Sequence, residues 1–114
     1  MEPPTRHINP LRSDLADDPD MVELLDFFVG ELGERIASLQ SHLNEQRLGD
    51  LRTLAHQLKG AAGGYGYPDL SRIAGTLEAS ITEGGPEPDP ATVKHAVDAL
   101  VDVCRRAIAG HHAA

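Results

Sequence analysis

The fold is decided by residues 19–46, which read PDMVELLDFFVGELGERIASLQSHLNEQ. Apolar side chains recur here at alternating spacings of three and four residues, at Val22, Leu25, Val29, Leu32, Ile36, Leu39 and Leu43. This spacing places them on one side of an α-helix, and Phe27 and Phe28 widen that side near its start. Asp18 followed by Pro19 is typical of a helix start, because aspartate caps free N–H groups and proline has none to satisfy. The stretch therefore predicts one long amphipathic helix.

The same periodicity predicts three more amphipathic helices, over residues 50–65, 68–83 and 90–109. Asp50 is expected to cap the first of these and Gly66 to end it, while Asp89 and Pro90 repeat the start signal before the last. Strand signals are almost absent, since the sequence has no alternating β-branched run and no Asn-Gly or Asp-Gly turn. Four such helices with short connections predict an all-α fold, an antiparallel four-helix bundle.

The 114 residues fit one domain. We expect an N-terminal arm over residues 1–17, the bundle over 18–109 and a frayed tail over 110–114. A short helix around Leu11 to Leu15 is expected to cover one end of the core. One apolar stripe on each helix leaves no second face to pair, so a monomer is expected.

Charge and composition exclude several classes of protein. The chain has 18 acidic and 10 basic residues and a net charge of −8, which disfavours nucleic acid and anionic membranes as partners. Cys104 is the only cysteine, so neither an intrachain disulfide nor a thiolate zinc site can form. No apolar run approaches the ~20 residues of a membrane span, and the N-terminus lacks an apolar signal core. We therefore expect a cytoplasmic protein.

The stretch that carries chemistry is residues 55–66, AHQLKGAAGGYG. Projected on a helix, Leu51, Leu54 and Leu58 fall on one side and His56 falls almost opposite their centre. His56 is therefore predicted to face solvent while its helix is anchored from behind. Three residues follow it on the same outward strip, namely Lys59, Gly60 and Gly63, and Gln57 borders that strip.

The glycines of this stretch need a reason, because each costs up to about 1 kcal/mol relative to alanine inside a helix. Close packing of a neighbouring helix is one explanation. A bare strip that lets a second protein approach the imidazole is the other. Gly60 suits the second explanation better, whereas Gly63 and Gly64 fit either.

An exposed imidazole beside a lysine has a consistent chemical use. The neutral ring is a nitrogen nucleophile at cellular pH, and it can take a phosphoryl group from a donor and pass it on. Lys59 would then balance part of the charge on the transferring group. No trio of carboxylates stands near His56 to hold Mg²⁺, so the metal that such transfers use is expected on the partner. The chain itself is expected to have no cofactor and no metal site.

These residues resemble the histidine-containing phosphotransfer (HPt) domain family. The resemblance rests on His56, Leu58, Lys59 and Gly60 with Gly66 six residues further on. It extends over about residues 18–109, including Ala55, Leu70, Leu77 and Glu78 downstream and upstream positions at Phe27, Phe28 and Leu32.

The resemblance implies an up-down-up-down bundle in which the outward Nε2 of His56 accepts the phosphoryl group. It implies that Lys59 supports the phosphoryl charge, that Gly60 leaves room for the partner and that Gly66 closes the helix. The implied partners are receiver domains of response regulators or hybrid histidine kinases, which supply a phospho-aspartate and Mg²⁺. The domain would be a phosphorelay carrier with no kinase or phosphatase activity of its own.

Two other functions stay open from the sequence. One is a helical interaction module that binds or inhibits a kinase or receiver domain without being phosphorylated. The other is an enzyme with a small-molecule substrate, which would need a deep cleft at His56. For a phosphorelay carrier, the partner is expected to cover His56, Lys59, Gly60, Gly63 and positions on the first helix that the sequence does not specify.

Overall fold

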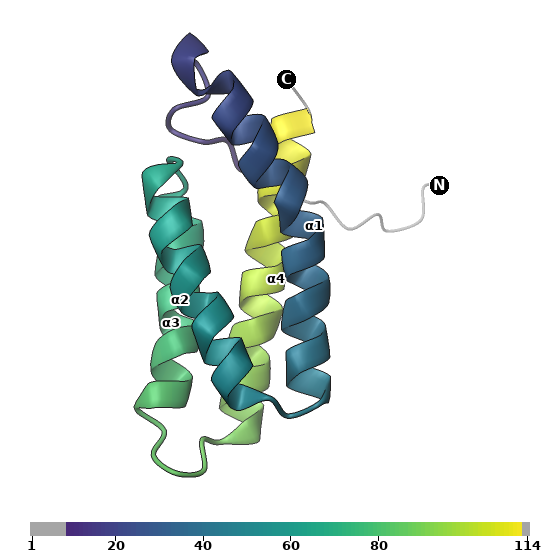
Figure 1. Ribbon diagram of the computed structural model, residues 1–114, viewed down its shortest axis with the longest axis vertical. Coiled ribbons are helices and arrows are strands. Elements are labelled where there is room, and N and C mark those ends of the chain that lie inside the picture. The colour runs from purple at the N-terminus through teal and green to yellow at the C-terminus, as the bar shows by residue number, and fades with distance from the viewer. Residues whose placement is uncertain (1–8, 113–114) are drawn as a thin grey trace, which may run out of the picture.

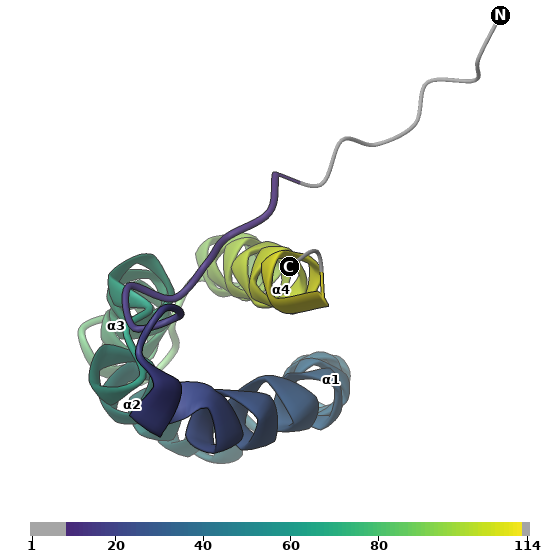
Figure 2. The ribbon, with the colours of Figure 1, turned by 90° about the horizontal axis from the view of Figure 1, so that it is seen from above.

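The computed structural model describes residues 9–112, and its helices follow the predicted order (Figure 1). They are a 3₁₀ helix η1 at Pro19–Met21 and four α-helices: α1 at Val22–Asn44, α2 at Leu48–Gly64, α3 at Pro68–Thr82 and α4 at Pro90–His112. Consecutive α-helices run in opposite directions (Figure 1). Figure 2 shows the ring that they form, with α2 next to α3 and α1 next to α4. The predicted all-α, up-down-up-down four-helix bundle is confirmed.

The core is built from the predicted stripes. The buried apolar residues include Leu25, Val29, Leu32, Ile36 and Leu39 from α1, Leu51, Leu54 and Leu58 from α2, Leu70, Ala74, Leu77 and Ile81 from α3, and Val93, Val97, Leu100 and Cys104 from α4. Two predicted members of the first stripe are wrong. Val22 is 48% exposed at the first residue of α1, and Phe27 is 65% exposed because, at about 100° per residue, it points away from the side of the helix that carries Leu25 and Val29.

The helix starts follow local hydrogen bonding. Asp18 accepts a 2.9 Å hydrogen bond from the Asp20 amide and so caps η1, the 3₁₀ helix that leads into α1, whereas α1 itself begins after Met21 without a side-chain cap. Asp89 accepts hydrogen bonds from the amide and hydroxyl of Thr92 and so caps α4. The prediction that Asp50 caps the second helix is wrong. That helix begins two residues earlier, at Leu48, so Asp50 lies inside its first turn.

Both ends of the bundle differ from the prediction. No helix forms over residues 11–15; this segment instead crosses one end of the bundle in an extended path followed by a turn. The prediction of a frayed tail from residue 110 is wrong for residues 110–112, which continue α4, and Gly110 packs against Leu11 of that segment. Residues 1–8 of the predicted arm and residues 113–114 of the predicted tail lie outside the described residues. Within the described part, no helix is long and apolar enough to cross a membrane.

Candidate functional site

His56 lies on the outward side of α2, where its side chain is 71% exposed. The opposite side of the helix is fixed in the core by the buried side chains of Leu51, Leu54 and Leu58. This is the arrangement that helical projection of the sequence predicts. The imidazole ring is therefore open to a second molecule while its backbone is held rigidly.

One ring nitrogen of His56 is held by a carboxylate of the neighbouring helix. Nδ1 of His56 lies 2.8 Å from Oε2 of Glu78, which projects from α3 and is 19% exposed. An ionised carboxylate only accepts hydrogen bonds, so in the neutral ring the proton of this pair belongs on Nδ1. The lone pair is then on Nε2, the other ring nitrogen.

Lys59 shares the same carboxylate. Its Nζ lies 3.7 Å from Oε1 of Glu78, and α3 also positions the lysine in two further ways. The Ser71 hydroxyl donates a 2.7 Å hydrogen bond to the backbone carbonyl of Lys59. The lysine stem also packs over Gly75 of α3, where an added Cβ would make an ordinary van der Waals contact with Lys59 Cδ at 3.5 Å. Glu78 thus joins His56 and Lys59 in one cluster.

The role of Glu78 is what sequence reasoning missed. The sequence indicates Glu78 only as part of the family resemblance and assigns no function to it. It directly follows the buried Leu77 and lies four residues after the buried Ala74, so it stands at the edge of the apolar side of α3. A carboxylate at such an edge is a usable signal, but only the packing of α3 on α2 shows which side chain it meets.

The glycines of α2 have no packing role that requires glycine. A Cβ added at Gly60 or Gly64 would meet nothing within 4 Å. At Gly63 it would stand 3.6 Å from the Ser71 hydroxyl oxygen, an ordinary van der Waals contact. Close approach of a neighbouring helix therefore does not explain Gly60 or Gly64, and it explains Gly63 only weakly. What remains is a strip of bare backbone beside His56.

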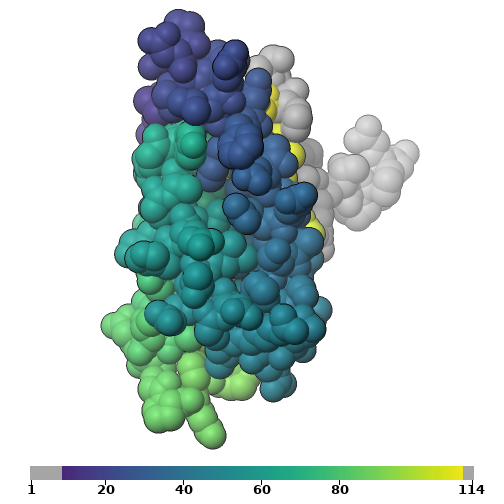
Figure 3. Space-filling view, viewed as in Figure 1, coloured from purple at the N-terminus to yellow at the C-terminus, as the bar shows by residue number. Residues whose placement is uncertain are grey.

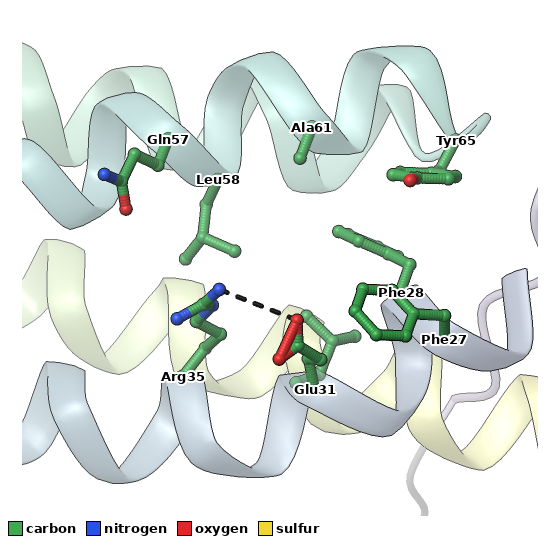
Figure 4. Close-up of a pocket in the computed structure, with 9 residues that line it drawn as sticks. Phe27, Phe28, Glu31, Arg35, Gln57, Leu58, Ala61 and Tyr65 are labelled. Atoms are coloured by element: carbon green, nitrogen blue, oxygen red, sulfur yellow. Dashed lines mark ion pairs between the residues drawn. The ribbon is translucent and has the colours of Figure 1, made fainter. Parts of the chain in front are cut away.

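A groove separates α1 from α2 on the face seen in Figure 3. It encloses about 380 Å³. Its lining residues are Phe27, Phe28, Glu31, Leu32 and Arg35 of α1 together with Gln57, Leu58, Ala61 and Tyr65 at the other wall (Figure 4). The floor is apolar, and the Arg35–Glu31 ion pair and Gln57 lie on its rim (Figure 4). We call it the α1–α2 groove.

Aromatic rings form the end of the α1–α2 groove near the close of α2. The ring of Phe28 stacks on Tyr65 with centroids 4.8 Å apart, and on Tyr67 at 5.7 Å. Phe27 stands beside this stack but outside the core (Figure 4). The sequence predicts both Phe27 and Phe28 on the buried side of the first helix. For Phe27 that is wrong, because it points to the groove and solvent.

Gly66 closes α2 in the left-handed backbone region, with φ of 81°. Glycine is favoured there because a Cβ would clash with the backbone. The Tyr67 amide then bonds back to the Ala62 carbonyl at 2.9 Å. Gly66 therefore ends the helix that carries His56, as predicted, and turns the chain into α3.

No group of three or more His, Cys, Asp or Glu side chains converges as a metal site would among residues 9–112. A family model described as Hpt domain matches residues 23–107, which is most of the chain. Searches of curated proteins and of solved structures gave no match.

Proposed function

Because this chain belongs to the Hpt domain family, we propose that His56 is the residue that carries the phosphoryl group. Domains of this family are phosphotransfer carriers in two-component signalling, and they act with receiver domains and histidine kinases. The chain therefore takes part in phosphotransfer of this kind. The finer statement is that His56 accepts the group from a receiver aspartate and passes it to a second receiver.

The observation that carries this proposal is the cluster of His56, Glu78 and Lys59 on an exposed surface. Nδ1 of His56 is bonded to Glu78 at 2.8 Å, which leaves Nε2 as the nucleophilic atom. The residue is 71% exposed, so a partner's side chain can approach in line with that atom. Positioning of this kind supplies most of the catalysis in phosphoryl transfer.

Transfer to His56 forms one bond to phosphorus and breaks another. The Nε2 lone pair forms the N–P bond as the bond between phosphorus and the acyl oxygen of the partner's aspartyl phosphate breaks. The aspartate leaves as its carboxylate. The Nδ1 proton stays in place, so the phosphorylated ring is cationic, and Glu78 lies where it stabilises that charge. Donation to a second receiver is the reverse of this step.

Lys59 supplies the remaining electrostatics. Its ammonium group lies near Glu78 and is half exposed, so it can turn toward a phosphoryl group on Nε2. A lysine stabilises phosphoryl oxygens as a point charge. The Mg²⁺ that neutralises the oxygens during transfer is proposed to belong to the receiver.

We propose that the receiver sits on the bare strip of Gly60, Gly63 and Gly64 and reaches over into the α1–α2 groove. Gln57 borders both surfaces. The positions on the first helix that the sequence did not specify are then Phe27 and Glu31 at the groove wall (Figure 4). An exposed aromatic beside a groove is a common anchor of protein interfaces.

The test is transfer of label from a phosphorylated receiver. Wild type is expected to take up acid-labile, base-stable phosphate, and His56→Gln to take up none. His95→Gln is the matched control, because His95 is an exposed histidine on α4, and it is expected to behave as wild type. Equal labelling of His56→Gln and wild type contradicts the proposal. Receiver binding that survives His56→Ala, with no label in wild type, would instead favour the non-phosphorylated interaction module.

A further inference from the structure

The N-terminal segment of residues 9–15, here called the strap, joins the end of α2 to the end of α4. At one end of the strap, the Leu11 amide donates to the Arg106 carbonyl at 2.9 Å, and Arg106 Nε donates to the Asn9 carbonyl at 2.8 Å. At the other end, the Asp14 amide donates to the Gly66 carbonyl at 2.8 Å. Two backbone hydrogen bonds and one from the Arg106 side chain thus join chain segments that are far apart in sequence.

Ser13 is the centre of the strap. It is the only buried polar or charged residue among those the structure describes, at 7% exposure. Its hydroxyl donates a 2.6 Å hydrogen bond to the Tyr65 carbonyl and accepts one from the Leu15 amide at 2.9 Å. The last carbonyls of a helix have no partner within the helix, so the strap supplies donors that α2 lacks at its end.

Two glycines make room for the strap. A Cβ at Gly66 would stand 2.5 Å from the Ser13 hydroxyl oxygen and 3.0 Å from Leu15 Cγ. A Cβ at Gly110 would collide with the backbone of Leu11. The close fit at both glycines shows that the strap packs tightly against the ends of α2 and α4.

The strap acts on the groove through Tyr65. The carbonyl of Tyr65 is held by Ser13, and its ring stacks on Phe28 at the end of the α1–α2 groove. We propose that Ser13 is a positioning residue that holds Tyr65 in this stack and so preorganises the groove for the receiver. This inference rests on the proposed function, because the groove is taken as part of the receiver's docking surface. His56 itself lies outside the strap contacts, so its reactivity is expected to be independent of them.

If Ser13 preorganises the groove, its removal should weaken receiver binding rather than slow the chemical step. A mobile Tyr65 must be ordered again when the partner binds, which weakens binding but leaves the reacting atoms unchanged. Ser13→Ala is therefore expected to raise KM for a phosphorylated receiver roughly three- to tenfold, the range that loss of one hydrogen bond produces. The kcat value and the labelling of His56 by phosphoramidate, a small phosphoryl donor, are expected to stay at the wild-type level.

The experiment compares the full-length Ser13→Ala variant, which removes the hydrogen bond to Tyr65, with Gly110→Ala, which disturbs the strap at Leu11. Ser80→Ala is the matched control, because Ser80 donates a 2.7 Å hydrogen bond to the Leu77 carbonyl near the opposite end of the bundle. NMR ring-current shifts of Phe28 and Tyr65 report the stack without any partner. Both strap variants are expected to change these shifts and to raise KM, and Ser80→Ala to change neither.

Three results would overturn the inference. Unchanged ring shifts in both strap variants would show that the strap does not hold Tyr65. Changed shifts with an unchanged KM would show that the receiver does not use this end of the groove, while phosphotransfer through His56 stands. If wild-type His56 is labelled by phosphoramidate but by no phosphorylated receiver, a receiver is not the partner. Both this inference and the proposed function are then wrong.

Discussion

Replacing Glu78 with glutamine tests whether the negative charge beside the His56 ring contributes to phosphoryl transfer. Glutamine has nearly the shape of glutamate and keeps an oxygen that can accept the hydrogen bond from Nδ1 of His56, which lies 2.8 Å from Glu78 Oε2. It therefore keeps the lone pair on Nε2. It removes the negative charge that faces the ring, which becomes cationic when Nε2 is phosphorylated.

The size of the effect follows from the geometry. A hydrogen bond to a charged group contributes about 1.5–3 kcal/mol, against about 0.5–1.5 kcal/mol for a neutral one. Because His56 is 71% exposed, the lower part of this difference applies, about 1 kcal/mol, or roughly fivefold in rate. Glu78→Ala removes the acceptor too, so the ring can rotate and place its proton on Nε2. We expect a further loss of roughly fivefold in that variant.

The assay is the rate of His56 labelling by phosphoramidate, because a small donor reports the ring without the docking surface. The expected order of rates is wild type, then Glu78→Gln, then Glu78→Ala. Glu83→Gln is a control that changes the same net charge at the end of α3. The reasoning is refuted if Glu78→Ala is labelled as fast as wild type, or if Glu83→Gln is slowed as much as Glu78→Gln.

Four further predictions follow from the described contacts. Gly60→Ala should raise thermal stability by up to about 1 kcal/mol, because its Cβ meets nothing and alanine favours a helix; a lower Tm would speak against an open strip. Phe27→Ala should change stability by less than about 0.5 kcal/mol in a denaturant titration yet raise KM for a receiver roughly tenfold, and an unchanged KM would exclude Phe27 from the interface. Gly66→Ala should destabilise the fold by at least about 1–2 kcal/mol, because φ is 81° and the strap leaves no room; equal stability would disprove both causes. Burial raises the pKa of the Cys104 thiol to about 12, so the native protein should resist iodoacetamide at pH 8 and react only when unfolded; rapid labelling of the native protein would show that the thiol is accessible.

The helices could be predicted because each has one continuous apolar side. The spacing of Leu25, Val29 and Leu32 predicts both that a helix forms and which of its sides is buried. The exposure of His56 followed from the same projection of α2. Both are properties of a single helix, so the residues of that helix alone are enough to predict them.

Relations between helices could not be predicted in this way. Periodicity assigns Glu78 to the edge of α3 but does not say that this edge meets His56. Projection at about 100° per residue places Phe28 beside the stripe of Leu25 and Val29 but Phe27 on the other side of the helix, so the exposure of Phe27 is contained in the sequence. Only the opening between α1 and α2 places Phe27 at the groove.

The sequence of the strap has no hydrophobic periodicity from which its position could be predicted. Its fit depends on backbone hydrogen bonds and on the absence of side chains at Gly66 and Gly110. A glycine near the end of a helix is typical of a helix stop, and the sequence predicts a frayed tail from Gly110 onward. In the structure Gly110 packs closely against the backbone of Leu11, and α4 continues through it to His112.

The central claim concerns one atom, Nε2 of His56, and ring nitrogen NMR tests it directly. The protein, labelled with ¹⁵N, is phosphorylated with phosphoramidate, and coupling between phosphorus and each ring nitrogen is recorded. We predict phosphorus coupled to Nε2 of His56 while Nδ1 keeps its proton toward Glu78. Phosphorus on Nδ1 of His56, or on another residue with His56 unmodified, would contradict the account.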